Sequence, residues 1–252
     1  MRSYKYLSWV TAIFVTCLIV ANIIAVKLIQ ITLPLLGPVV LPAAVIIFPI
    51  SYIFVDVLTE VYGYARARQV IWIGFACNLL AVAAIAISGA LPPASFWAPN
   101  QSAYESILGF TPRLLVASFI AYLVGEFLNS FVLARMKVAT NGRRLWARTI
   151  GSTLIGQLAD SFVFITLGLV QVTSLPPALQ GTLPPEALPG AITAQWLFKS
   201  AYEAIATPLT YLVVNRLKRA ESEDVFDRDT DFNPFAFTVE TSGSNPPKSS
   251  VN

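Results

Sequence analysis

The sequence predicts an all-α membrane protein, a bundle of six transmembrane helices with both the N- and C-termini in the cytoplasm. Three observations support this fold class. The 252-residue chain is 56% hydrophobic and only 12% charged, with a mean hydropathy of +0.66, which is far more apolar than a soluble domain. It contains six continuous apolar runs of membrane-spanning length. Basic residues gather in every second segment between these runs.

Each apolar run has the length that a transmembrane helix requires, since crossing about 30 Å of hydrocarbon takes roughly 20 helical residues. The runs lack the two-residue alternation of a membrane β-barrel, so helices are the expected spanning elements. Arg2 and Lys5 before the first run are also typical of a signal peptide, but the run is long and no small-residue cleavage pattern follows it. The expected helices cover residues 8–26, 39–62, 69–90, 113–135, 150–172 and 191–215.

The basic residues predict the orientation, because loops on the cytoplasmic side carry an excess of Lys and Arg. Only Lys27 and Arg113 lie in the segments expected outside. The basic residues lie at the ends of the expected helices, so membrane topology accounts for them and no role in nucleic-acid binding is needed. The residues expected on the cytoplasmic side are Arg2, Lys5, Arg66, Arg68, Arg135, Lys137, Arg143, Arg144, Arg148, Arg216, Lys218 and Arg219.

The chain divides into two parts at residue 219. Residues 1–219 hold fifteen basic and seven acidic side chains and form the expected six-helix transmembrane domain. Residues 220–252 hold two basic and seven acidic side chains, are rich in Pro, Ser and Asn, and lack apolar periodicity, so we expect a disordered acidic cytoplasmic tail. The chain has no histidine, and Cys17 and Cys77 lie in apolar runs, so we expect no Ser-His-Asp chemistry, no His-zinc site and no disulfide framework. For the chain as a whole, we expect no metal site, no cofactor and no enzyme activity.

Six charged side chains fall inside the expected helices, where each costs about 2.5 to 3.5 kcal/mol on insertion scales and requires a partner or a function. Tyr52, Asp56 and Glu60 follow one another at four-residue spacing and share one helix face. The two carboxylates repel unless one is protonated, a cation lies between them, or Glu60 lies in the wetter interface beside Arg66 and Arg68. The six residues are Asp56, Glu60, Glu126, Asp160, Lys199 and Glu203.

The fourth and fifth expected helices each carry a carboxylate and an amide on one face, which predicts a polar cavity between them. "GEFLNSFV" at 125–132 and "GQLADSFV" at 156–163 are identical at four of eight positions. Glu126 and Asn129 occupy the same offsets as Gln157 and Asp160, and Gly156 allows close helix approach. The similarity reflects either an inverted repeat or chance agreement among small and apolar residues.

The sixth expected helix places Gln195, Lys199 and Glu203 on one face, with Trp196 beside them. Lys199 and Glu203 either neutralise each other or contribute to ion coupling. Glu60 is a third candidate for an ion-pair or coupling role. One lysine against five acids leaves the interior acidic. This balance favours cations, protons or amino-rich solutes over anions.

At these residues the sequence resembles the queuosine precursor transporters, also called vitamin uptake transporters. The resemblance covers nearly all of residues 8–219. It implies a multi-pass importer of 7-deazaguanine bases, chiefly 7-cyano-7-deazaguanine, in the bacterial inner membrane, which supplies tRNA modification. The implied partners are the base and the lipid bilayer, with no nucleic acid, and self-association into a homo-oligomer is left open. The resemblance is carried by "FPISYIFVDVLTEVYG", "YLVGEFLNSFVLARMK", "WARTIGSTLIGQLADSFVFI" and "KSAYEAIATPLTYLVVNRLK".

A base of this kind presents a ring N–H beside an exocyclic amine, and one carboxylate accepts both. An amide is then expected to serve the neighbouring carbonyl, and Tyr52, Phe127, Phe162 or Trp196 to stack on the ring. The candidate substrate-binding residues are Tyr52, Asp56, Glu126, Asn129, Gln157, Asp160 and Trp196. The candidate coupling or ion-pair residues are Glu60, Lys199 and Glu203.

Other functions remain open at this stage. A solute-binding subunit of an ATP-driven importer also fits six helices, but the chain has no G-x-x-x-x-G-K-[ST] motif, so a partner chain would bind the ATP. An intramembrane aspartyl hydrolase would use Asp56 and Asp160 as a dyad, although "GQLAD" lacks the G-x-G-D context. A helper role in membrane assembly is the remaining alternative.

Overall fold

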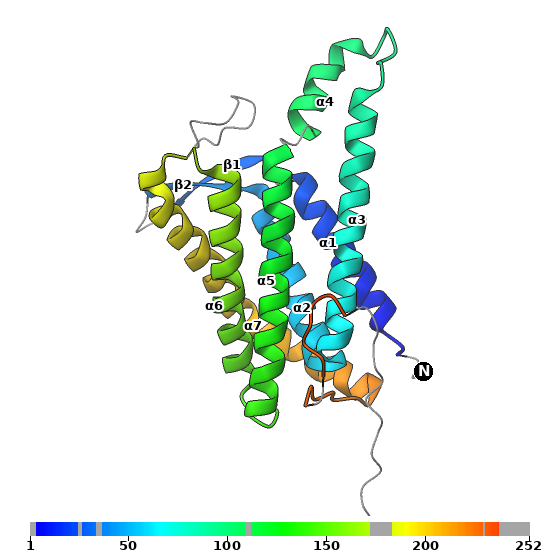
Figure 1. The fold of residues 1–252 in the computed structure, drawn as a ribbon, viewed down its shortest axis with the longest axis vertical. Coiled ribbons are helices and arrows are strands. Elements are labelled where there is room, and N and C mark those ends of the chain that lie inside the picture. Colours follow the sequence, from blue (N-terminus) through cyan, green and yellow to red (C-terminus); the bar gives the residue numbers. More distant parts are fainter. Residues whose placement is uncertain are drawn as a thin grey trace, which may run out of the picture.

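The computed structural model describes residues 4–24, 27–33, 37–108, 112–171, 183–228 and 230–236. Six long helices dominate this part of the chain (Figure 1), and each overlaps one of the six expected ranges. A short helix, α4 (Gln101–Leu108), projects at the end of α3. The long helices are α1 (Leu7–Ile24), α2 (Phe48–Tyr62), α3 (Tyr64–Ala90), α5 (Pro112–Ala139), α6 (Leu145–Phe164) and α7 (Leu188–Glu221).

Four of these helices are long and apolar enough to cross a bilayer, namely α1, α3, α5 and α6 with its continuation Ile165–Leu169. The chain therefore has the apolar helices of a multi-pass membrane protein. Helix α2 has only 15 residues, about 22 Å at 1.5 Å per residue, and α7 has 34 residues with charged side chains among them. The count of six spans stays a prediction.

Helix α2 is the shortest of these six helices but lies at the centre of the bundle. Helices α1, α3, α5 and α7 all contact it, and every residue from Ser51 to Tyr62 except Phe54 is buried. Other helices therefore cover α2, and lipid does not have to accommodate its polar side chains. This position allows α2 to carry two buried carboxylates.

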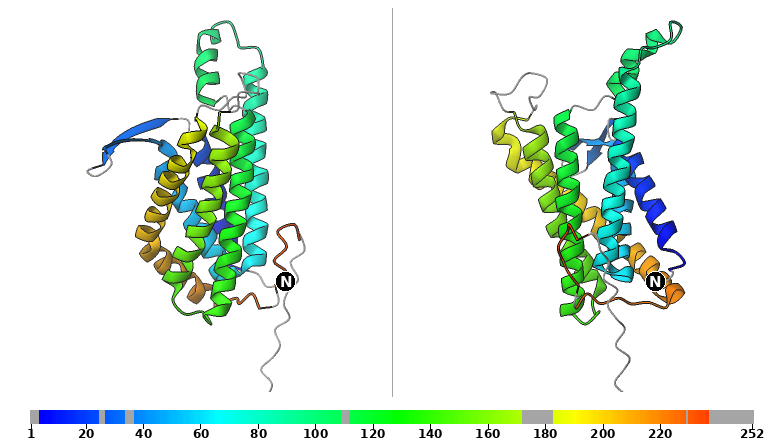
Figure 2. Two further views of the ribbon diagram at one scale, coloured as in Figure 1. Left: turned by 60° about the vertical axis from the view of Figure 1, so that its left-hand side comes forward. Right: turned by 45° about the vertical axis from the view of Figure 1, so that its right-hand side comes forward.

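The second expected helix, 39–62, is wrong in its first part. Residues 28–42 instead form a hairpin of β1 (Leu28–Leu33) and β2 (Gly37–Pro42), which pair antiparallel with Leu28 opposite Pro42 and project from the bundle (Figure 2). The segment "GPVVLP" contains two prolines, which lack the N–H that a helix interior requires. Pro49 falls in the first turn of α2, where that loss is tolerated, so it starts the helix and makes no kink.

The two ends of the helical chain meet at one end of the bundle (Figure 1). The N-terminus, the α2–α3 junction, the α5–α6 turn and the C-terminal end of α7 all lie there, and we call this the basic end. Glu221 of α7 accepts hydrogen bonds from the backbone N–H groups of Lys5 at 3.0 Å and Tyr6 at 2.7 Å, and from the Tyr62 hydroxyl at 3.0 Å. The segments expected in the cytoplasm thus come together.

The prediction that residues 220–252 form a disordered tail is wrong for the part of this segment that the structure describes. Helix α7 continues to Glu221, and residues 223–236, apart from 229, lie against the basic end. Asp227 is 3% exposed and accepts the backbone N–H of Tyr64 at 3.0 Å, where α3 begins. Residues 237–252 lie outside the described residues, so their disorder stays a prediction.

Candidate functional site

Four helices direct polar side chains into the interior of the bundle. Helix α2 contributes a face on which Tyr52, Asp56 and Glu60 are all buried, as their four-residue spacing predicts. Helices α5, α6 and α7 face it with further buried or half-buried polar groups. These are Glu126 and Asn129 on α5, Gln157 and Asp160 on α6, and Lys199 and Glu203 on α7.

Asp56 is held by one of its two carboxylate oxygens. Its Oδ1 accepts a hydrogen bond from Asn129 Nδ2 at 2.8 Å, which joins α2 to α5. Its Oδ2 is buried and has no hydrogen-bond partner among the described residues, and the same is true of Asn129 Oδ1. Glu203 and Glu126 lie close enough to act on Asp56 electrostatically. Asp56 therefore presents one fixed, open oxygen to the interior.

Lys199 bonds across the helix interface to α6. Its Nζ donates to Asp160 Oδ2 and lies 5.9 Å from the centroid of the Tyr52 ring, within the range of a cation–π contact. Glu203, one turn further along α7, is 2% exposed, and neither of its oxygens has a hydrogen-bond partner among the described residues. Lys199 thus forms an ion pair with Asp160, and its role in ion coupling stays a prediction.

Tyr52 lies where the polar faces converge. Its hydroxyl is hydrogen-bonded by the Gln157 side chain, and Asp160, Glu126 and Glu203 all act on it electrostatically. These neighbours come from α5, α6 and α7, so the Tyr52 side chain of α2 interacts with residues of all three of these helices. The residues that spacing assigned to separate faces therefore form one site.

Buried oxygens without a hydrogen-bond partner among the described residues gather at this site. Leaving a buried polar atom unpaired costs about 1 to 3 kcal/mol, so several together indicate a surface shaped for another molecule. All of them are acceptors, which suits a solute rich in N–H groups, a cation or a proton. They belong to Asp56, Glu126, Asn129, Gln157 and Glu203, which we call the acceptor cluster.

The aromatic candidates lie in different places. Trp196 Nε1 donates to the backbone carbonyl of Leu154 at 2.8 Å, which ties α7 to α6. Phe162 is 56% exposed and faces outward, so it is wrong as a stacking residue in the interior. Phe127 packs against Trp72 on α3, with ring centroids 5.8 Å apart. Of the four rings, Tyr52 is the one placed within the acceptor cluster.

Helices α5 and α6 cross closely at Gly125 and Gly156. A Cβ on Gly125 would lie 2.8 Å from Asp160 Cβ, and a Cβ on Gly156 would lie 2.8 Å from Asn129 Cβ and 2.9 Å from the Gly125 carbonyl oxygen. Each glycine thus faces the polar residue at the fifth position of the other octapeptide. This reciprocal antiparallel contact is the arrangement that an inverted repeat predicts.

The substitution Gly156→Ala is expected to lower the stability of the folded chain by about 1 to 3 kcal/mol, because its Cβ would press on backbone and Cβ atoms of α5 that cannot rotate away. Thermal unfolding in mild detergent measures the change. Gly190→Ala on α7 is the matched control, since no atom lies within 4 Å of the added Cβ. Equal melting temperatures for both variants would contradict the close crossing.

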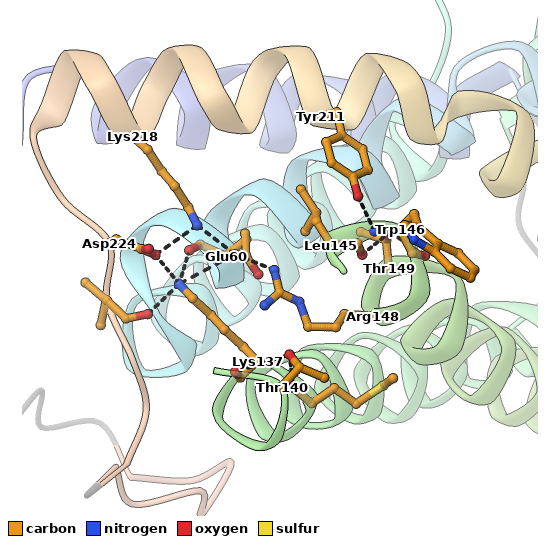
Figure 3. A network of polar contacts seen from close by, with 12 residues as sticks. Glu60, Lys137, Thr140, Leu145, Trp146, Arg148, Thr149, Tyr211, Lys218 and Asp224 are labelled. Carbon is orange, nitrogen blue, oxygen red and sulfur yellow. Dashed lines mark hydrogen bonds and ion pairs between the residues drawn. The ribbon is translucent and has the colours of Figure 1, made fainter. Parts of the chain in front are cut away.

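A second polar cluster lies at the basic end (Figure 3). Glu60 is fully buried, and its Oε1 accepts hydrogen bonds from Arg148 Nη2 at 2.9 Å and Lys218 Nζ at 2.7 Å. Lys137 Nζ lies 3.6 Å from the same oxygen and 2.6 Å from Asp224 Oδ1. Asp224 also lies 2.8 Å from Lys218 Nζ. We call these five residues the ion-pair cluster.

Of the three alternatives for Glu60, the wet interface beside Arg66 and Arg68 does not apply, because Glu60 is buried with Lys137, Arg148 and Lys218. The sequence pattern predicts only a topological role for these three cations. A signal was present in their spacing, since steps of four residues lead from Asn129 to Lys137 and from Asp160 back to Arg148. The polar faces therefore extend further toward the basic end than the carboxylates alone suggested.

The charge of Asp224 suits its place in the ion-pair cluster. Burial acts to raise the pKa of its carboxyl group, but hydrogen bonds from Lys137 and Lys218 outweigh that effect and hold the pKa below its ordinary value. Asp224 is therefore ionised at neutral pH. The two lysines are shared between it and Glu60.

Comparison with known proteins adds a family to this geometry. Residues 42–213 match a family model described as "putative vitamin uptake transporter". A protein of Bacillus subtilis (strain 168) described as "probable queuosine precursor transporter" is 32% identical over 159 residues, which are 62% of this chain and 64% of that protein. The "queuosine precursor transporter" of Escherichia coli (strain K12) is 28% identical over 117 residues, 46% of this chain and 50% of that protein.

The "probable queuosine precursor transporter" of Haemophilus influenzae (strain ATCC 51907 / DSM 11121 / KW20 / Rd) is 26% identical over 127 residues, 49% of this chain and 50% of that protein. The chain thus spans between half and just under two thirds of the length of these relatives. No solved structure matches the chain.

Proposed function

The chain belongs to the vitamin uptake transporter family, as the match over residues 42–213 shows, and on this premise we propose that it imports queuosine precursors. The family expected from the sequence is thereby confirmed. The proposed substrate is a 7-deazaguanine base, chiefly 7-cyano-7-deazaguanine, which carries the chemistry that the acceptor cluster lacks. We place the protein in the bacterial inner membrane, with six helices crossing it and the basic end in the cytoplasm, because basic segments remain on that side.

The acceptor cluster is the observation that carries this proposal. A 7-deazaguanine base presents a ring N–H and an exocyclic amine on one edge, and the open oxygens of Asp56, Glu126 and Glu203 can accept hydrogen bonds from such donors. Each buried acceptor that a base leaves without a donor costs about 1 to 3 kcal/mol, so a base without these N–H groups is disfavoured. The Tyr52 ring beside them offers a surface for stacking.

The variants Glu126→Gln and Asp160→Asn are each expected to reduce uptake at least ~10-fold, since losing about 1.4 kcal/mol of binding is a factor of ten. Both changes preserve the shape of the side chain and remove its charge. Uptake of the radiolabelled base is measured in cells that lack their own route for it, with the amount of protein in the membrane checked for each variant. Glu105→Gln, on the exposed face of α4, is the matched control and is expected to transport normally. Native uptake by both interior variants would rule out this site.

Reconstitution separates a self-sufficient carrier from a subunit that needs an ATPase. Purified protein in liposomes without ATP is expected to take up the base. A comparison with and without a proton gradient then reports whether the buried carboxyl groups couple transport to protons. Uptake that requires an added ATPase would instead support the solute-binding subunit.

A further inference from the structure

Buried polar residues, which we call the polar lining, lie along the helices between the acceptor cluster and the ion-pair cluster. Asp56 and Glu60 are one helical turn apart on α2, about 6 Å along the axis. On α7, Thr207 and Thr210 are buried between Glu203 and Lys218. Further buried polar residues continue this lining on the other two helices, namely Ser130 on α5 and Thr149, Ser152 and Thr153 on α6.

The ion-pair cluster closes the basic end of this lining. Glu60 on α2 bonds Arg148 of α6 and Lys218 of α7, and Lys137 of α5 donates to the Glu60 backbone carbonyl at 2.6 Å. One residue therefore joins all four helices that carry the polar faces. An opening toward the basic end has to separate these partners.

The first half of the C-terminal segment lies directly over this closure. The chain leaves α7 at Ser222, whose left-handed conformation at φ 54° turns it back toward the bundle. Lys137 Nζ, which lies beside Glu60, also donates to the Asp224 carboxylate at 2.6 Å and the Val225 carbonyl at 2.6 Å. Asp227 then accepts the Tyr64 backbone N–H at the start of α3.

The second half of the segment joins α3 to α5. The ring of Phe232 lies 5.0 Å from that of Tyr64 and 5.1 Å from that of Phe131, and the Arg135 guanidinium lies 4.6 Å above it. Arg68 on α3 donates to two further backbone carbonyls of the segment, at 2.8 and 2.7 Å. An acidic and aromatic segment thus matches a basic and aromatic surface.

We propose that residues 223–228 and 230–236 form a latch, a bound segment that stabilises the closed basic end, and that opening toward this end requires its release. The role of the latch in opening and closing rests on the proposed transport function, whereas its contacts are given by the geometry alone. The latch binds Lys137 and Lys218 in the positions that they take when they also hold Glu60. A group that binds one state of an equilibrium favours that state, so removing the latch shifts the protein toward the open arrangement.

Cysteine labelling tests the latch without any substrate. Cys17 and Cys77 are replaced by alanine, and Thr210→Cys introduces a thiol at a fully buried site between the two clusters. Inside-out membrane vesicles are treated with a membrane-impermeant maleimide. Truncation after Ser222 removes the latch and is expected to raise the labelling rate about 10-fold, within the usual range of such couplings. Truncation after Ala236 retains the latch and is the matched control, with an expected rate equal to that of the full chain.

Equal labelling rates for the full chain and the truncation after Ser222 would overturn the latch. Where that truncation does not accumulate, Phe232→Ala in the full chain takes its place, because it removes the ring contacts to α3 and α5, and a several-fold faster rate is expected. An unchanged rate in this variant overturns the latch equally. Faster labelling without uptake of the base would leave the latch standing and count against the proposed substrate alone.

Discussion

Glu60→Gln is expected to lower the stability of the folded chain by about 3 to 5 kcal/mol, the usual cost of removing one partner from a buried ion-pair network. The carboxylate is fully buried, and its loss leaves Lys137 and Arg148, each 1% exposed, without their shared counter-charge. Asp224 still balances the two lysines in part. The Arg148 guanidinium is left with the least compensation, because its Nε and Nη1 already have no hydrogen-bond partner among the described residues. Thermal unfolding in mild detergent is expected to show a lower Tm by on the order of 10 °C.

Two further variants separate charge from packing. Glu60→Asp keeps the negative charge on a shorter side chain and is expected to retain part of the stability that Glu60→Gln loses. Lys218→Met removes the most exposed of the three cations, at 21%, and is expected to cost least among their substitutions. A Tm for Glu60→Gln equal to that of the native chain would mean that the cluster contributes nothing to stability.

The positions of the long helices could be predicted from the sequence because each one depends on a sustained local apolar run. The error at residues 39–47 has a local cause as well. Hydropathy does not distinguish a helix from an apolar hairpin, and the turn and strand signals in "GPVVLP" were outweighed by the apolar run that follows them.

The tail was misjudged because composition is averaged over a segment, whereas docking depends on single side chains. Phe226, Phe232 and Phe235 are few among many polar residues. Each nevertheless meets a partner, respectively the Lys137 ammonium, the Tyr64 ring and the Trp72 ring. Complementarity of this kind lies between parts of the chain about 90 to 170 residues apart, so no local pattern predicts it.

In the interior site, too, the sequence predicts local features but not contacts between distant parts of the chain. Spacing correctly placed Asp56 with Tyr52, and Glu126 with Asn129, because residues three or four apart share a helix face. Partners across helices were not predictable, since they depend on how the helices cross. The pairing of Lys199 with Asp160, 39 residues away, is the clearest case.

Lys199→Met is expected to abolish uptake and to lower stability by about 1 to 3 kcal/mol, because it leaves the Asp160 carboxylate without its cation. The expected cost is smaller than at Glu60, since the side chains of Lys199 and Asp160 are 19% and 12% exposed and water screens part of the charge. Adding Asp160→Asn removes the stranded charge, so the double variant is expected to regain most of the stability. Melting temperatures of the native chain, the two single variants and the double variant give the coupling energy.

Uptake by the same four proteins distinguishes a structural ion pair from a functional one. If the pair only holds α6 against α7, the double variant regains transport together with stability. If Asp160 contacts the base, as its place among the candidate substrate-binding residues predicts, the double variant is stable but does not transport. Lys199→Met with Glu203→Gln is the matched control, because it would regain stability only if Lys199 balanced Glu203. Rescue by Asp160→Asn and not by Glu203→Gln therefore identifies the partner of Lys199, and the absence of transport in the rescued protein assigns the carboxylate to the transport path.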